Sequence, residues 1–224
     1  MGRKNSREVT VGFNASGAAR AASQGYVVLI VDVIDMSTSL EAALDGGAAF
    51  IFGASPDKTK APVQVNPFRI GYIAGQKAQE LESEVVIITE PRWGTKTQRS
   101  NNCTNVLRGI KDAGASVLDI VPNLGAEVIK TIDFQNKIVV CVSDTGGVAY
   151  DAAFQFHEKV ITGTIARTPK MKGNQPALKA VQRAIDLAQG ENIAVIAASS
   201  NSLEDVLGAN YICQMIINLG YLNA

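Results

Sequence analysis

Acidic side chains follow four short apolar runs of this sequence, at residues 26–31, 85–88, 138–142 and 193–198. The acidic residues that follow these runs are Asp32, Asp35, Glu90, Asp144, Glu204 and Asp205. Clustered carboxylates suit a hard cation such as Mg²⁺, which takes oxygen ligands, keeps several waters and bridges to phosphate. The predicted Mg²⁺ ligands are Asp32, Asp144, Glu204 and Asp205.

Carboxylates can also act as the base that orients an attacking water in a hydrolytic reaction. The residues predicted to take part in catalysis are Asp32, Asp35, Glu204 and Asp205.

Hydroxyl, amide and glycine residues occupy the same junctions, where an apolar run gives way to a helical pattern. A helix N-terminus offers free N–H groups and a positive dipole end, which favour a phosphate or sulfonate oxygen. An arginine adds a bidentate clamp for such an anion. The predicted substrate contacts are Ser37, Thr38, Arg92, Asp144, Thr145, Gly146, Gly147, Ser200 and Asn201.

Each of these residues also has a simpler structural explanation. Asp32 can cap a loop N–H, Thr38 and Ser202 can cap helices, and Gly146 with Gly147 can form a tight turn. Capping alone does not require polar residues to recur after several strands. Ligands bind at the carboxyl ends of the strands in open α/β sheets, so the recurrence favours a functional site.

The elements that must position these residues alternate between strand and helix. Buried parallel strands are predicted from apolar, β-branched runs at residues 9–13, 26–33, 49–52, 85–88, 116–121, 137–142, 159–162 and 192–197. Helical patterns lie between them at residues 38–45, 67–82, 103–113, 148–156, 176–189 and 202–219. This alternation predicts an α/β fold, a three-layer α/β/α sandwich with a mostly parallel central sheet.

Local signals mark some of the boundaries. Thr38 and Glu41 have the spacing of a capping box, which predicts a helix start at Thr38. Gly114 is a natural left-handed stop for the helix before it. The stretches at residues 54–66 and 165–175 are predicted to be loops, and the second carries three basic residues.

The length of 224 residues favours a single α/β domain over residues 1–224. Residues 1–7 are predicted to form a basic tail, and a weak subdivision near residues 115–135 stays open. Lys and Arg together number 21, as do Asp and Glu, so no global positive field would gather nucleic acid or an anionic membrane. No apolar run approaches the ~18 residues of a membrane span. We therefore expect neither a nucleic-acid nor a membrane partner.

The cysteines and the single histidine exclude several kinds of site. Cys103, Cys141 and Cys213 are far apart and odd in number, so neither a disulfide framework nor a zinc ribbon is expected, and a reducing cytoplasm fits best. Cys103 stands at a predicted helix start, where the dipole could lower its pKa, although a structural role is the simpler interpretation. His157 stands alone, which argues against a Ser–His–Asp triad.

Two motifs resemble those of the 2-phosphosulfolactate phosphatase family. Residues 31–38 (VDVIDMST) resemble its opening motif, roughly DVLRAST, and residues 199–208 (SSNSLEDVLG) resemble its closing motif. Residues 143–147 (SDTGG) and 90–94 (EPRWG) are weaker counterparts of its TTNGT and GERGG segments. The order and spacing agree over about residues 27–219.

The resemblance implies a three-layer α/β/α fold and a Mg²⁺-dependent phosphatase. That family hydrolyses 2-phospho-3-sulfolactate, an intermediate of coenzyme M biosynthesis, to sulfolactate and phosphate. The positions that match by the resemblance are Asp32, Ser37, Thr38, Glu204 and Asp205, whereas Asp35 stands where the family motif has an arginine. The leading hypothesis is a cytoplasmic Mg²⁺-dependent phosphatase that acts on a small anionic phosphate ester.

Two other functions stay open at this point. Asp35 and the altered middle motifs favour a non-catalytic small-anion-binding or assembly protein on the same fold. A lyase or transferase acting on a small acid is the third hypothesis. The helical pattern at residues 202–219 is apolar over more than one stripe, so we expect it in the core or at a symmetric interface of a homo-oligomer.

Overall fold

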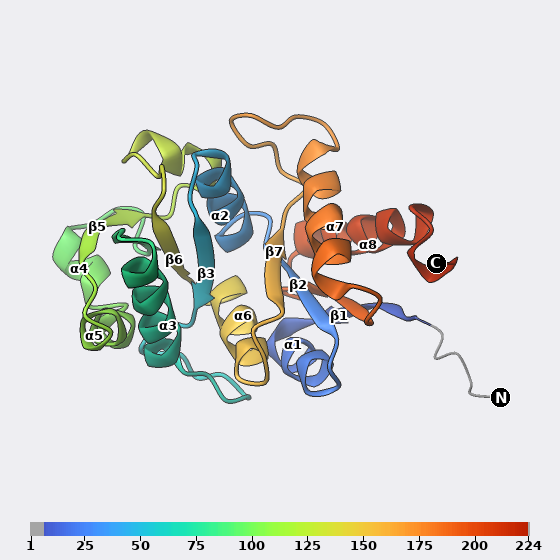
Figure 1. The fold of residues 1–224 in the computed structure, drawn as a ribbon, viewed down its shortest axis with the longest axis horizontal. Coiled ribbons are helices and arrows are strands. Elements are labelled where there is room, and N and C mark those ends of the chain that lie inside the picture. Colours follow the sequence, from blue (N-terminus) through green and yellow to red (C-terminus); the bar gives the residue numbers. More distant parts are fainter. Residues whose placement is uncertain (1–6, 224) are drawn as a thin grey trace.

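The computed structural model describes residues 7–223 as an alternation of parallel strands and helices (Figure 1). The strands are β1 (Val9–Phe13), β2 (Val27–Val31), β3 (Phe50–Ala54), β4 (Val85–Thr89), β5 (Val117–Pro122), β6 (Ile138–Val142), β7 (Val160–Gly163) and β8 (Ile193–Ala197). The α-helices are α1 (Asn14–Ser23), α2 (Met36–Asp45), α3 (Pro67–Glu80), α4 (Lys96–Ser100), α5 (Thr104–Asp112), α6 (Gly146–Phe154), α7 (Gln175–Ala188) and α8 (Leu203–Asn218). Two 3₁₀ segments, η1 (Gly125–Lys130) and η2 (Tyr221–Asn223), complete the described chain.

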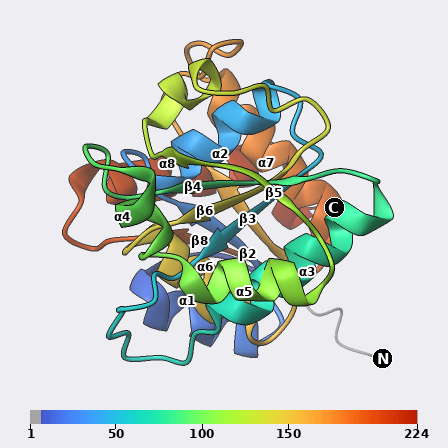
Figure 2. The same cartoon turned by 90° about the vertical axis from the view of Figure 1, so that its left-hand side faces the viewer.

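The strands form two four-stranded sheets in which every paired strand is parallel to its neighbours. The first sheet has the order β1-β8-β2-β7, and the second has the order β3-β6-β4-β5. Helices cover both faces of these strands, with α2 and α7 above and α1, α3 and α5 below in Figure 2. The predicted three-layer α/β/α architecture with parallel strands is confirmed, although the strands divide into two sheets.

The division falls between β7 and β3, because β7 pairs only with β2 and β3 pairs only with β6. The chain crosses from one sheet to the other twice, through α2 between β2 and β3, and through α6 between β6 and β7. Both crossing helices pack against β3. Met36 of α2 and Tyr150 of α6 both lie against Gly53 of β3, where an added Cβ would come within 2.5 Å and 2.7 Å of their side chains.

All eight predicted strands are present, with boundaries that differ by at most three residues from the prediction. Their central residues are fully buried in β2, β4, β6 and β8, which is why unbroken apolar runs marked them. All six predicted helices are present as well.

Helix α1 was not predicted from the sequence. Its buried face consists of Ala15, Ala18, Ala21 and Ala22, which are small and give only a weak apolar pattern. The same small side chains let α1 pack against α6. Helix α4 was also missed, because it is only five residues long and none of them is buried.

The predicted capping box at Thr38 is wrong. Helix α2 begins at Met36, so Thr38 and Glu41 lie inside the helix, and both are buried. Their side chains bond to other elements instead, Thr38 to Thr164 and Glu41 to Thr162 and Arg183. Tertiary hydrogen bonds to these two side chains therefore outweigh their local preference for a helix N-terminus.

Arg7 and the three cysteines contact other parts of the fold. Residues 1–6 of the predicted basic tail lie outside the described residues, and Arg7 stacks on Tyr221 instead of extending into solvent. Cys103, Cys141 and Cys213 are free and buried. Burial raises the pKa of Cys103 to about 12, which supports the structural role expected for this thiol and not an activated one. Within residues 7–223, no helix is long and apolar enough to cross a membrane.

Candidate functional site

Asp32 joins the two sheets at the carboxyl ends of β2 and β6. Its Oδ2 accepts hydrogen bonds from the Thr145 hydroxyl at 2.9 Å and from the backbone N–H of Gly146 at 2.7 Å. Its Oδ1 accepts from the backbone N–H of Asp35 at 3.2 Å. Gly146 is the first residue of α6, so Asp32 caps this helix from a different sheet.

The carboxyl group of Asp32 is held where a negative charge is unfavourable. Only 2% of the residue is exposed. Burial, and then the negative charge of Asp205, raise the pKa of Asp32 to about 6, against the opposing bonds from Thr145 and Gly146. A carboxyl with this pKa can exchange a proton close to neutral pH.

Asp205 ties the loops after β2 and β8 together. Its Oδ1 accepts from the backbone N–H of Val33 at 2.8 Å, and its Oδ2 accepts from that of Ser199 at 3.2 Å. Its own N–H donates to the Ser202 hydroxyl, which is the predicted N-cap of α8. Burial raises the pKa of Asp205 as well. Asp32 and Asp205 are therefore neighbouring buried acids at one strand edge.

Asp35 forms an ion pair with Arg92. Its Oδ1 lies 2.5 Å from Nη2 of Arg92, which comes from the loop after β4. The Nε of the same guanidinium lies 3.5 Å from Glu90. Arg92 thus places a positive charge against the carboxylate of Asp35.

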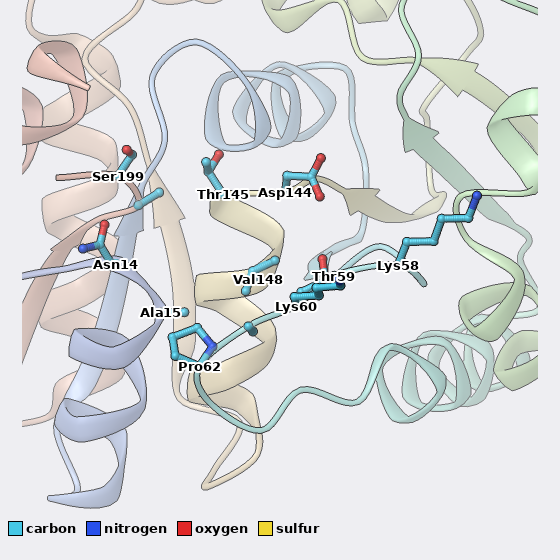
Figure 3. A pocket seen from close by; sticks show the side chains of 12 residues that line it. Asn14, Ala15, Lys58, Thr59, Lys60, Pro62, Asp144, Thr145, Val148 and Ser199 are labelled. Carbon is cyan, nitrogen blue, oxygen red and sulfur yellow. The ribbon is translucent and has the colours of Figure 1, made fainter. Parts of the chain in front are cut away.

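An open pocket of about 500 Å³ lies beside this network (Figure 3). Its walls are the residues that follow β1, β6 and β8 and the loop between β3 and α3. Asp144 and Thr145 stand at the start of α6, with Asn14 and Ser199 on one side and residues 58–60 on the other. The pocket therefore combines hydroxyl and amide groups with one carboxylate and two lysines.

Asn14 shapes the pocket wall at the β1–α1 junction. Its φ of 61° is in the left-handed region, which asparagine tolerates better than most residues. Its Oδ1 accepts from the backbone N–H of Ser200 at 2.8 Å, and its Nδ2 donates to the Ser200 hydroxyl at 3.1 Å. This pair fixes the loop after β8 against the end of β1.

Ser37 and Thr38, predicted to hold phosphoryl oxygens, are buried. The Ser37 hydroxyl donates to the carbonyl of Ile30 and accepts from the N–H of Asp32. The Thr38 hydroxyl bonds to the carbonyl of Val33 and to Thr164. Both side chains therefore support the turn after β2.

The other predicted site residues differ in their surroundings. Gly147 is the second residue of α6, and its N–H donates to the Ser143 hydroxyl at 2.9 Å. Glu204 is exposed in the first turn of α8, 3.3 Å from the Ser202 hydroxyl. Asn201 is exposed in the loop after β8, and its N–H donates to the Ser199 hydroxyl.

The four predicted Mg²⁺ ligands do not form a preassembled metal centre. Among residues 7–223, no group of three or more His, Cys, Asp or Glu side chains is placed to hold a metal ion. Asp32 and Asp205 are buried and bonded to N–H or O–H donors, whereas Asp144 and Glu204 are exposed. A metal held by protein side chains alone does not fit this arrangement.

Sequence reasoning missed three groups at the pocket, Asn14, Lys58 and Lys60. The lysines belong to a loop that had no pattern beyond its polar composition. Asn14 had a usable signal, because an asparagine between a strand and a small-residue helix is a good candidate for a left-handed turn.

The site presents hydroxyl, amide and lysine groups that suit a small anion, and Asp32 beside it can exchange a proton near neutral pH. No known protein family matches the chain, and no curated protein is significantly similar to it in sequence.

Proposed function

We propose that this chain is a Mg²⁺-dependent phosphatase that hydrolyses a small anionic phosphate ester in the pocket beside Asp144 and Thr145. The observation that carries the proposal is the juxtaposition of a 500 Å³ polar pocket with the network of buried acids at the ends of β2, β6 and β8. Resemblance to the 2-phosphosulfolactate phosphatase family suggests a sulfonated phosphate ester as the first substrate to test. Three free, buried cysteines favour a cytoplasmic setting.

The lysines of the pocket supply the attraction for such an ester. Lys58 and Lys60 are exposed on the loop between β3 and α3, and both line the pocket. Each is a compact positive charge that suits phosphate oxygens. Asn14 and Ser199 add polar groups on the opposite wall. A small ester with two negative groups fits this distribution of donors.

Mg²⁺ usually binds through one or two carboxylates together with substrate phosphate, so a complete protein cage is not required. Asp144 is the exposed carboxylate in the pocket wall and is the residue that would hold the ion with the bound ester. The ion would offset negative charge on the phosphoryl group.

Thr145 connects the pocket with Asp32. Because its hydroxyl proton is donated to Asp32, its oxygen lone pairs remain available on the pocket side. In the proposal, Thr145 accepts a hydrogen bond from the attacking water, and Asp32 holds Thr145 in that orientation. Asp144, which is in reach of solvent, is the proposed base for that water. It would take one water proton as the water oxygen bonds to phosphorus and the ester P–O bond breaks, and it would return that proton to the departing alcohol oxygen.

The test is phosphate release by the purified full chain with Mg²⁺ and a panel of small phosphate esters that includes 2-phosphosulfolactate. Asp144→Asn and Thr145→Val are expected to lower release on the order of 100-fold. Asp186→Asn, a change at an exposed acid on α7, should leave release unchanged. Absence of release from every ester, with folded protein and saturating Mg²⁺, would overturn the proposal.

A non-catalytic anion-binding protein is the second candidate function. It is favoured by the buried state of Asp32 and Asp205, whose oxygens already accept bonds that stabilise the loops. Calorimetry separates the two functions. Micromolar binding of an ester without phosphate release would support this second function, and loss of that binding in Lys60→Met would locate it in the pocket.

A further inference from the structure

Helix α8 presents a row of large apolar side chains to solvent. Leu203, Leu207 and Tyr211 are 67%, 55% and 46% exposed, and Leu219, just after the helix, is 54% exposed. They follow one another at four-residue spacing, with the partly buried Met215 completing the row. Residues four apart are neighbours on a helix surface, so these side chains form one continuous row that winds gradually around the helix, with Tyr211 at its centre. We call these five residues the α8 ridge.

Beyond Glu204 and Asp205 in its first turn, helix α8 carries no charged residue. Residues 206–224 include no Asp, Glu, Lys, Arg or His. The exposed polar residues beside the ridge are neutral amides that bond within the helix, Asn210 to the carbonyl of Val206 and Gln214 to Asn218. A helix face that remains in water normally carries charged residues, whereas the centre of a protein interface is depleted of them.

We propose that the α8 ridge is the interface through which two copies of this chain form a symmetric dimer. A two-fold axis would lay α8 antiparallel against α8 of the second copy, so that the same ridge contacts itself. An uncharged ridge can pair with itself without placing like charges together. Membrane-surface helices carry Lys and Arg on their polar face, and this helix has neither, which disfavours a lipid surface as the occupant.

The extent of the ridge sets the expected affinity. Its side chains expose on the order of 500 Å², which is in the range of the largest patch on a typical monomer and often marks an interaction site. Pairing of two copies would bury on the order of 1,000 Å² in total, the low end for a specific interface. We therefore expect a dimer with a dissociation constant in the micromolar range.

The position of α8 in the fold is consistent with this pairing. The helix lies at the end of the molecule opposite to α4 and β5 (Figure 1). It packs on β1, the edge strand of its sheet, whose outer edge has no partner among the described strands. A second copy beside α8 would approach this open edge, which natural proteins tend to cover.

The experiment is sedimentation velocity of the full chain over a concentration series from about 1 to 100 μM, the range that brackets a micromolar dimer. The unmodified protein should shift from monomer to dimer across the series. Leu207→Arg and Tyr211→Arg should each weaken dimerisation at least about tenfold, because each buries an unpaired charge. Leu178→Arg is the matched control, since Leu178 is also an exposed leucine, on α7 beside Lys179, and it should leave dimerisation unchanged.

Two results would overturn the proposal. One is a monomer at every concentration, whether or not the chain binds vesicles of neutral or anionic lipid. The other is dimerisation that the ridge variants leave unaltered. Thermal unfolding of each variant separates loss of the interface from loss of the fold, because these side chains are exposed and their replacement should change the melting temperature little. The result does not depend on phosphatase activity.

Discussion

Arg92 reaches from the loop after β4 to Asp35 in the loop after β2, with Nη2 and Oδ1 2.5 Å apart. The two residues are 57 positions apart in the sequence and belong to loops of different sheets. Their pairing neutralises a carboxylate that would otherwise stand unopposed near Asp32 and Asp205, both of which are repelled by it.

Exchanging the two charges should preserve the pair. Arg92→Asp and Asp35→Arg each place like charges together, whereas the double variant restores an opposite pair. Because both side chains are partly exposed, we expect a coupling of about 0.2–1 kcal/mol. Urea unfolding of the four proteins measures it. A coupling of zero would mean that the contact contributes nothing to stability.

Asp32→Asn should stabilise the protein at neutral pH. The pKa of Asp32 is raised from 3.8 to about 6, so the folded state binds the proton more tightly than the unfolded state does. The contribution of this proton to the free energy of unfolding is therefore full below pH 4 and is lost as pH rises through 6. The asparagine removes the charge and keeps an acceptor for Thr145 and Gly146, but it loses the acceptor for the Asp35 N–H. We therefore expect a net gain on the order of 1 kcal/mol at pH 8.

The control for this prediction is the same measurement at pH 4, where the two proteins should differ much less. Denaturant unfolding at both values of pH provides the comparison. The free energy of unfolding of each protein is compared between pH 4 and pH 8. An equal decrease in the variant and the parent protein would mean that the ionisation of another group controls the pH dependence.

Gly147→Ala should damage the start of α6. A Cβ at this position would lie 2.0 Å from the backbone oxygen of Ala54, so either α6 or the end of β3 must move. We expect a loss of about 2–4 kcal/mol in the free energy of unfolding. Gly25→Ala is a suitable comparison, because it has open space around it and a φ of +80°, and it should cost only about 1–2 kcal/mol. Equal losses in the two variants would contradict the close contact.

Arg183→Met should leave a buried charge without its partner. Glu41 is fully buried, and its Oε1 lies 2.5 Å from Nη2 of Arg183, while its Oε2 has no hydrogen-bond partner. Burial already raises the pKa of Glu41, and loss of the arginine should raise it further. We expect a loss of about 3–5 kcal/mol at pH 8.

This loss should shrink as pH falls, because a protonated Glu41 no longer needs the cation. Unfolding measured at pH 5 and pH 8 checks the direction. The double variant with Glu41→Gln should recover most of the stability at pH 8. A pH-independent loss would show that the arginine acts through packing, including its bond to the carbonyl of Thr162.

The strands were predictable because burial on both faces leaves an uninterrupted apolar run, as in Val85–Thr89. Helix α1 was not, because its contacts are made by alanines whose pattern is faint. The sequence also indicated correctly that the segments after β2, β6 and β8 meet. The hydrogen bonds from the Gly146 N–H to Asp32 and from the Val33 N–H to Asp205 confirm this.

The use of individual polar side chains was much harder to predict. Ser37, Thr38 and Glu41 have the types and spacing of ligand or capping residues, but the fold uses them as internal partners. Two of these pairings, Thr38 with Thr164 and Glu41 with Thr162, join residues more than 100 positions apart, and no local pattern specifies them. Lys58 and Lys60 present the opposite case, since only the three-dimensional path of their loop brings them to the pocket.

The side chain of Asp32 links the two sheets of the molecule. It follows β2 of the first sheet and accepts hydrogen bonds from Thr145 and Gly146, which follow β6 of the second sheet. Adding or removing one proton at this carboxyl therefore changes the strength of a bond between sheets that the chain itself links only through α2 and α6. By thermodynamic reciprocity, a ligand that changes the contact between Asp32 and the start of α6 also changes the pKa of Asp32. The pKa of this carboxyl therefore reports how the two sheets are placed relative to each other.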